Sequence, residues 1–287
     1  MCISDEIDPR VAAAAAPREA PGPAVDPIAL SPVDSVSITT LVDNVYDGLL
    51  LSNERVARAP LAGASVPAAH FLEGQALVGM RAEHGYSAFI TVRRGDRSWR
   101  MVFDTGLSPD AMVENARRMG IALDDVNAVV LSHGHFDHAG GLLGLVSAYG
   151  RTRLPLTVHP FAWTRRRFAI PGAPDWELPT LSRSALDAEG FELIERAIPS
   201  LLLDGSVLVT GEVDRVTDFE QGMPPSHQAW DGRAWVPDRV VIDDQALVVN
   251  VRGRGLVIVT GCGHAGVVNI VRHAMRLTGV SRLAGVV

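Results

Sequence analysis

The chain has 287 residues, of which 47% are hydrophobic, and a formal net charge of −7. This length suits one large domain or two small ones with a packed core. The negative net charge excludes the overall basic surface by which many proteins bind nucleic acid, although not a local basic patch. The two cysteines exclude a disulfide framework. No apolar stretch is long enough to span a bilayer, and the acidic start does not resemble a secretory leader, so we expect a reducing, cytoplasmic location.

The beginning of the chain differs in composition from the rest. Residues 1–33 are rich in Ala, Pro and Asp and have no hydrophobic period, which predicts a disordered tail before a single domain at 34–287. Residues 52–77 contain Pro60, Gly63 and Pro67, which predict a loop-rich insertion near the start of the domain.

Most of the domain alternates between β-type and helical patterns. Ser108 and Pro109 suit the cap and first turn of a helix that reaches about Met119. Further helices are expected to begin at Gly140 and to span 267–277. Two β-rich halves with helices predict two sheets packed face to face with helices outside. The predicted strands are 37–42, 88–92, 99–103, 128–131, 156–158, 201–203, 207–209, 246–251, 256–260 and 283–287.

One short loop concentrates the chemistry. After the apolar run 128–131, His133, His135 and His138 occur within six positions, although the whole chain has nine histidines. Residues two apart in an extended backbone point the same way, so His133 and His135 can meet at one ion. Asp137 and His138 are expected to point away from that pair, toward a second ion roughly 3.5–4 Å away. A solvated polar loop is the alternative interpretation.

Several motifs resemble a known family. The sequence His133-x-His135-x-Asp137-His138, preceded by Asp104-Thr105-Gly106, resembles the signature of the metallo-β-lactamase fold superfamily. The resemblance runs from about Val36 to the end and implies an α/β fold, a four-layer αββα sandwich of the metallo-β-lactamase type. Two further segments resemble the branch named 7,8-dihydropterin-6-methyl-4-(β-D-ribofuranosyl)-aminobenzene-5′-phosphate synthase: Glu83-His84-Gly85 and Thr260-Gly261-Cys262-Gly263-His264-Ala265-Gly266-Val267-Val268-Asn269-Ile270.

The resemblance implies roles for individual residues. Asp137 would bind metal and orient the nucleophile, and Asp104 would orient a ligating imidazole, with a capping role at a strand–helix junction as its alternative. His84 and His159 are expected near the substrate, although a polar turn and a structural role remain open for them. The implied metal ligands are His133, His135, Asp137, His138 and His264.

Other residues were weighed for the same site. Family members continue into a Gly-Gly-Phe-His segment, so we expect the last C-terminal elements and the last metal ligand to be absent here. Three explanations stay open: the sequence is a fragment, the second metal site is impaired, or another group substitutes. Cys262 is predicted to be a buried small hydrophobe rather than a soft ligand. The run 165–167 is predicted to be solvated rather than anion-binding. His70, His227 and His273 are predicted to lie on the surface or in loops, and the candidates for a bridging acid are Asp244, Glu212 and Glu220.

These features predict a metal-dependent hydrolase. Zinc, at one or two ions per chain, would activate water for attack on an ester, amide or phosphoester bond, and Mn2+ or Fe2+ are alternatives. The expected partner is a small molecule, pterin-related or phosphorylated. Two other functions stay open: a non-catalytic binding module with an incomplete metal site, and a phosphodiesterase that acts on nucleotides.

Overall fold

Two large sheets dominate the computed structural model, which describes residues 26–59, 64–150 and 153–287. The first sheet has the strand order β1 (Ser35–Val42), β4 (Ser87–Arg94), β5 (Arg97–Phe103), β6 (Ala128–Val130), β7 (Leu154–Val158) and β10 (Phe191–Glu195). In it β1, β4 and β5 are antiparallel, whereas β6, β7 and β10 run parallel to β5. The second sheet has the order β11 (Ser200–Leu202), β12 (Val207–Val209), β15 (Ala246–Val251), β16 (Gly255–Thr260) and β17 (Leu283–Val286).

Alternating side chains place apolar residues on both faces of each sheet. Ile90 of β4 and Val249 of β15 belong to the core between the sheets, whereas Phe89 belongs to the core under the first helices. Val248 points the other way, into the core under the last helix. This is the alternation expected when both faces of a strand are covered. Four layers result.

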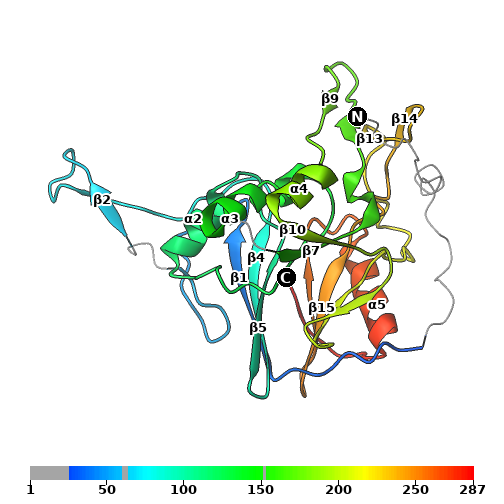
Figure 1. The fold of residues 1–287 in the computed structure, drawn as a ribbon, viewed down its shortest axis with the longest axis horizontal. Coiled ribbons are helices and arrows are strands. Elements are labelled where there is room, and N and C mark those ends of the chain that lie inside the picture. Colours follow the sequence, from blue (N-terminus) through cyan, green and yellow to red (C-terminus); the bar gives the residue numbers. More distant parts are fainter. Residues whose placement is uncertain (1–25, 60–63, 151–152) are drawn as a thin grey trace.

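Helices cover the outer faces (Figure 1). The first sheet packs against α2 (Ala111–Arg118), α3 (Leu142–Tyr149) and α4 (Arg183–Glu189). The second packs against α5 (Val267–Thr278), which begins directly after the loop that follows β16. The predicted αββα sandwich is therefore confirmed. None of the helices in the described part of the chain is long and apolar enough to cross a membrane.

Two boundaries differ from the prediction. Helix α2 begins at Ala111 rather than Ser108, because the backbone N–H groups of Leu107 and Ser108 donate to the Glu83 carboxylate and hold the preceding loop open. Residues 1–25 of the predicted tail lie outside the described residues. The tail prediction is wrong for its last residues, since Leu30 and Val33 are buried against the domain.

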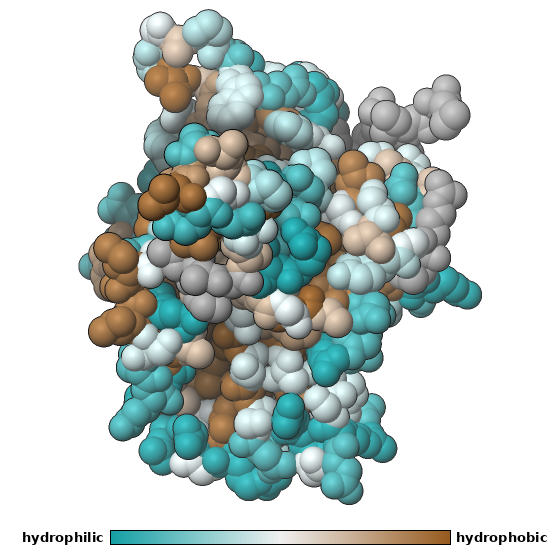
Figure 2. All heavy atoms as spheres, turned by 90° about the vertical axis from the view of Figure 1, so that its left-hand side faces the viewer, coloured by the Kyte–Doolittle hydropathy of each residue, from teal (hydrophilic) through white to brown (hydrophobic). Residues whose placement is uncertain are grey.

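Two smaller sheets extend from the sandwich (Figure 1). One has the order β14 (Trp235–Pro237), β13 (His227–Trp230), β8 (Arg166–Phe168) and β9 (Trp176–Glu177), and the sequence patterns did not predict it. The other pairs β2 (Ser65–Pro67) with β3 (Gln75–Leu77) in the predicted loop-rich insertion. Hydrophobic and polar side chains are mixed on the face from which β2 and β3 project, as Figure 2 shows.

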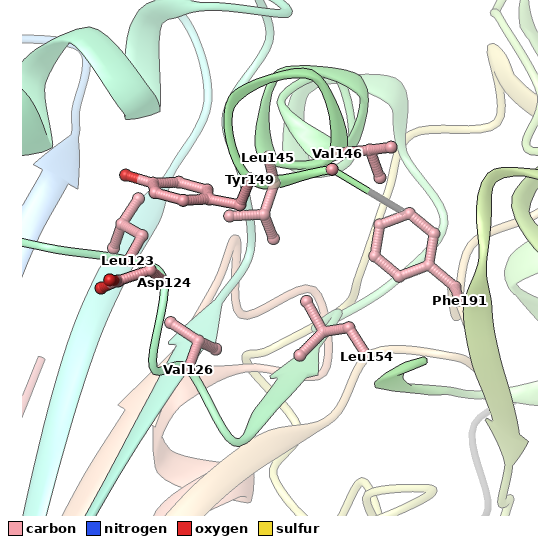
Figure 3. A pocket seen from close by; sticks show the side chains of 9 residues that line it. Leu123, Asp124, Val126, Leu145, Val146, Tyr149, Leu154 and Phe191 are labelled. Carbon is pink, nitrogen blue, oxygen red and sulfur yellow. The ribbon is translucent and has the colours of Figure 1, made fainter. Parts of the chain in front are cut away.

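A small apolar cavity of about 100 Å³ lies beneath the C-terminal half of α3 (Figure 3). Leu145, Val146 and Tyr149 of the helix face Leu154 and Phe191 of the first sheet across it. None of the predicted site residues lines it. The chemistry of the chain is therefore concentrated elsewhere.

Candidate metal centre

The histidine loop is fixed by contacts with both halves of the fold. It leaves β6, and the N–H of Gly134 donates to Asp243 Oδ2 at 2.8 Å. A Cβ at Gly134 would collide with the carbonyl oxygen of Ala162, so glycine is required by close approach rather than by the turn. A single 3-10 turn, Phe136–His138, then sets the direction of Asp137 and His138.

Three imidazoles from two distant stretches of the chain converge. His133 Nε2 lies 2.9 Å from His135 Nδ1, and His264 Nε2 lies 3.2 Å from His133 Nε2. The ring of His264 is 4.7 Å from that of His133 and 5.0 Å from that of His135. These three residues form one group whose nitrogens could hold a single ion.

A second group shares His133. His138 Nε2 lies 3.0 Å from Cys262 Sγ and 3.5 Å from Asp137 Oδ2. Two predictions are wrong here. The ring of His138 lies 4.3 Å from that of His133 instead of pointing away from it, and Cys262 is exposed, with its thiol toward His138. The 3-10 turn Phe136–His138 and the loop after β16 bring these atoms together, and the local sequence predicts neither.

Asp104 fixes the orientation of two rings. This fully buried carboxylate accepts hydrogen bonds from Ser132 N, Ser132 Oγ and His138 Nδ1, each at 2.6 Å. Because a carboxylate only accepts, the Ser132 hydroxyl donates to Asp104 and accepts from His133 Nδ1 at 2.8 Å. His133 therefore presents an unprotonated Nε2 to the centre.

His135 is oriented by His227, which was expected on the surface or in a loop. Its Nε2 lies 3.0 Å from Nε2 of His227, whose Nδ1 lies 2.9 Å from the carbonyl oxygen of Asp238. A carbonyl only accepts, so His227 Nδ1 is protonated and its Nε2 accepts from His135. His135 Nδ1 is then unprotonated as well. Two bare nitrogens, His133 Nε2 and His135 Nδ1, thus face each other at 2.9 Å.

The electrostatics keep most of these rings neutral. Burial lowers the pKa of His133 and His135 well below the usual value, and the positive charges of His138 and Arg166 respectively add to the effect. Burial likewise lowers the pKa of His264 to about 3. For His138, burial acts downward, but the Asp104 carboxylate outweighs it and holds the pKa well above the usual value. Neutral imidazole is the form that binds metal.

His84 lies at the rim of the centre. Its Nε2 is 3.2 Å from Asp137 Oδ2, and its side chain is 70% exposed. The segment is anchored on both sides, by Glu83 on the loop before α2 and by Gly85, which has a φ of +116° and packs against the backbone carbonyl of Asp137. The structure therefore holds an accessible imidazole over the Asp137 carboxylate.

His159 is not part of this arrangement. Its side chain is fully buried, its Nδ1 accepts from Phe161 N at 3.2 Å, and its Nε2 lies 3.6 Å from Glu212 Oε1. A substrate cannot reach this ring in the observed conformation. The expectation that His159 binds substrate is not supported by its position.

The acids proposed as bridging groups make other contacts. Asp244 Oδ2 accepts from Ala265 N at 2.8 Å, and Glu220 accepts from the N–H groups of Val268 and Asn269 at the start of α5. Glu212 lies beside His159. Among the described residues, neither candidate metal group includes any of the three acids.

Three of the minor expectations need correction. Arg166 is only 3% exposed and is not part of a solvated run, because it pairs with Asp238 and Asp243. His227 on β13 and His273 on α5 are buried instead of lying on the surface. His70 is exposed, as predicted.

Comparisons with known proteins identify the family of the chain. Residues 85–273 match the family model described as the Metallo-beta-lactamase superfamily. Two curated proteins of Methanocaldococcus jannaschii are similar: a 7,8-dihydropterin-6-methyl-4-(beta-D-ribofuranosyl)-aminobenzene-5'-phosphate synthase, 25% identical over 72% of this chain and 70% of that protein, and an uncharacterized protein, 28% identical over 71% and 72%. The crystal structure of Tm1679, a metal-dependent hydrolase of the beta-lactamase superfamily, superposes with a TM-score of 0.57 at 22% identity, covering 85% of this chain and 72% of the other.

Proposed function

Because the chain belongs to the metallo-β-lactamase superfamily, we propose that it is a metal-dependent hydrolase whose centre is built from two donor groups. The first is His133 Nε2, His135 Nδ1 and His264 Nε2. The second shares His133 and adds His138 Nε2 and Cys262 Sγ, with Asp137 Oδ2 3.5 Å from His138 Nε2. Three protein ligands that leave a position open are typical of catalytic zinc.

One observation carries the proposal. The hydrogen bonds of Ser132 and His227 leave unprotonated nitrogens of His133 and His135 facing each other at 2.9 Å. Two lone pairs this close repel, and His264 Nε2, 3.2 Å from His133 Nε2, adds a third nitrogen to the same group. A cation between the rings would turn this repulsion into coordination. Cys262 favours zinc over manganese, because a thiolate is a soft ligand.

The residues around the centre suit hydrolysis. A divalent ion held by these donors supplies Lewis acidity and makes water more acidic when it is bound. Asp137 accepts the proton or orients the attacking water, since its carboxylate faces His138 on one side and His84 on the other. His84 is exposed and within hydrogen-bond reach, so it can carry a proton to solvent or bind a substrate group.

We propose a small molecule as the substrate. The name of one curated relative describes a phosphorylated pterin derivative. Pterin-related and phosphorylated compounds are therefore the first to test. A phosphodiesterase that acts on nucleotides would use the same residues, and turnover of bis(p-nitrophenyl) phosphate compared with an ester and a lactam separates these activities. The cytoplasmic location remains a prediction from the cysteine content.

Metal content per chain tests the proposal. Protein purified without added metal is expected to retain a divalent ion, and the double variant His133→Ala/His135→Ala is expected to lose it. His70→Ala is the control, since His70 is exposed and lies outside both donor groups. Equal metal content in the double variant and the wild type would refute the assignment. Metal binding without turnover of any compound would favour the binding module instead.

A further inference from the structure

We propose that His227, on β13 of the small sheet, is a positioning residue that selects which nitrogen of His135 faces the metal centre. The inference rests on the proposed function, because it assigns His135 Nδ1 as the donor. His227 is fully buried, and its ring meets that of His135 edge to face at 5.0 Å and 79°. The two Nε2 atoms are 3.0 Å apart.

The protonation pattern of His227 is set by Asp238, which contacts the ring nitrogen that does not face His135. Its Nδ1 lies 2.9 Å from the Asp238 carbonyl oxygen, and the Asp238 N–H donates back to the His227 carbonyl at 2.9 Å. The ring of Phe168 packs against the imidazole at 5.2 Å and excludes water from that side. Because the Asp238 carbonyl oxygen cannot donate, the hydrogen in this contact must be carried by His227 Nδ1. His227 Nε2 is consequently an acceptor, and His135 has to donate from Nε2.

A buried guanidinium holds this arrangement in place. Arg166 Nε donates to Asp238 Oδ2 at 2.9 Å, and the same guanidinium donates to both oxygens of Asp243. Asp243 in turn accepts from Gly134 N at 2.8 Å, between the first two histidines of the loop. We call Arg166, His227, Asp238 and Asp243 the outer clamp. Through the Arg166 guanidinium, the outer clamp fixes both the backbone of the histidine loop and the ring of His135.

Such outer contacts have a measurable effect on a metal site. Removing the partner of a ligating imidazole typically lowers metal affinity by about 10–100-fold, because the ring loses its tautomer and orientation. The small sheet carries Arg166 on β8 and His227 on β13, and Asp238 directly follows β14. This sheet is therefore part of the metal centre rather than a peripheral addition. Its absence from the predicted elements is why sequence patterns did not reveal the role.

Two variants of His227 separate its contacts. In His227→Gln the terminal oxygen can reach the Nε2 position and accept from His135. In His227→Asn the amide can occupy the Nδ1 position and donate to Asp238, but it does not reach His135. His273→Asn is the control, since His273 is a similarly buried histidine, 6% exposed, on α5 and outside both donor groups.

Zinc affinity, measured by competition with a chromophoric chelator, is expected to fall about 10–100-fold in His227→Asn. It is expected to stay within a few-fold of wild type in His227→Gln and in His273→Asn. The visible spectrum of the cobalt-substituted protein should change in His227→Asn alone. Equal affinities for the two His227 variants would overturn the proposal, and so would loss of a whole metal equivalent in both, which would make His227 a ligand.

A second measurement needs no metal. Two-dimensional 1H–15N spectra of the imidazoles in metal-free protein should show His135 protonated at Nε2 and His227 protonated at Nδ1. His227→Asn should leave His135 as a mixture of tautomers, whereas His227→Gln should preserve the wild-type pattern. An unchanged His135 tautomer in His227→Asn would refute the positioning role. If the wild type binds no metal, the proposed function fails, and these spectra still decide the role of His227.

Discussion

Replacing Asp104 by asparagine tests how the centre is oriented. The substitution keeps the size of a fully buried side chain but turns one accepting oxygen into a donating amide group. One oxygen can still accept from Ser132 N. The amide nitrogen then faces Ser132 Oγ and His138 Nδ1, which both donate to Asp104 in the native protein.

The magnitude follows from those contacts. A hydrogen bond to a charged group contributes about 1.5–3 kcal/mol, so losing two would cost about 3–6 kcal/mol if nothing adjusted. The Ser132 hydroxyl can rotate and the His138 ring can lose its Nδ1 proton while keeping the one on Nε2, which recovers part of the loss. We expect a net loss of about 2–3 kcal/mol in the free energy of unfolding. The Nε2 of His138 would then keep its N–H toward Cys262 and could not act as a metal donor.

The distinctive result is selective loss of metal. Asp104→Asn should weaken the group formed with His138 and Cys262 about 10–100-fold, while the group that contains His264 is less affected. Elemental analysis gives the stoichiometry, and urea unfolding gives the stability. Asp96→Asn in an exposed turn is the matched control. Wild-type stability and wild-type metal content in Asp104→Asn would refute the reasoning.

Three further substitutions have defined outcomes. Burial raises the pKa of Asp244 from 3.8 to about 7, so the contribution of this residue to stability is complete below pH 4 and is lost as the pH rises to 7. The loss is at most about 4 kcal/mol in the free energy of unfolding. Asp244→Asn should remove it in urea unfolding measured at pH 4 and pH 8, and equal pH dependence in the variant and the wild type would contradict the assignment. Cys262→Ser should lower the retained zinc with little change in unfolding free energy, because the side chain is exposed; unchanged zinc would argue against a ligand role. Gly85→Ala should destabilise the protein by about 1–3 kcal/mol, because its Cβ would meet the Asp137 carbonyl, whereas Gly95→Ala, with open space, should cost about 1 kcal/mol. Similar melting temperatures for these two glycine variants would contradict that explanation.

Local patterns were sufficient for the sandwich and for the histidine loop. Strands such as 88–92 and 246–251 have apolar residues on both faces, and the structure buries both faces. The convergence of His264 with His133 required more than pattern, since 131 residues separate them. Their meeting was expected only because the motifs resemble a family in which such segments converge.

Residues whose surroundings come from distant segments were misjudged. Arg166 stands between two other arginines, and a run of like charge is ordinarily solvated. Its burial depends on Asp238 and Asp243, more than seventy positions away along the chain. Cys262 was expected in the core because free cysteine is usually buried, but the loop after β16 exposes it next to His138. Neither environment can be read from neighbouring residues.

Each of the three sheets around the centre contributes one restraint on it. Asp104 follows β5 of the first sheet and orients His138, Asp243 lies before β15 of the second sheet and holds Gly134, and the small sheet supplies the partner of His135. None of these restraints exists before the corresponding layers have docked. The donor nitrogens therefore acquire their directions only in the folded chain, which makes metal affinity a property of tertiary structure. A substitution that loosens the docking of any one layer should accordingly weaken metal binding before it unfolds the domain.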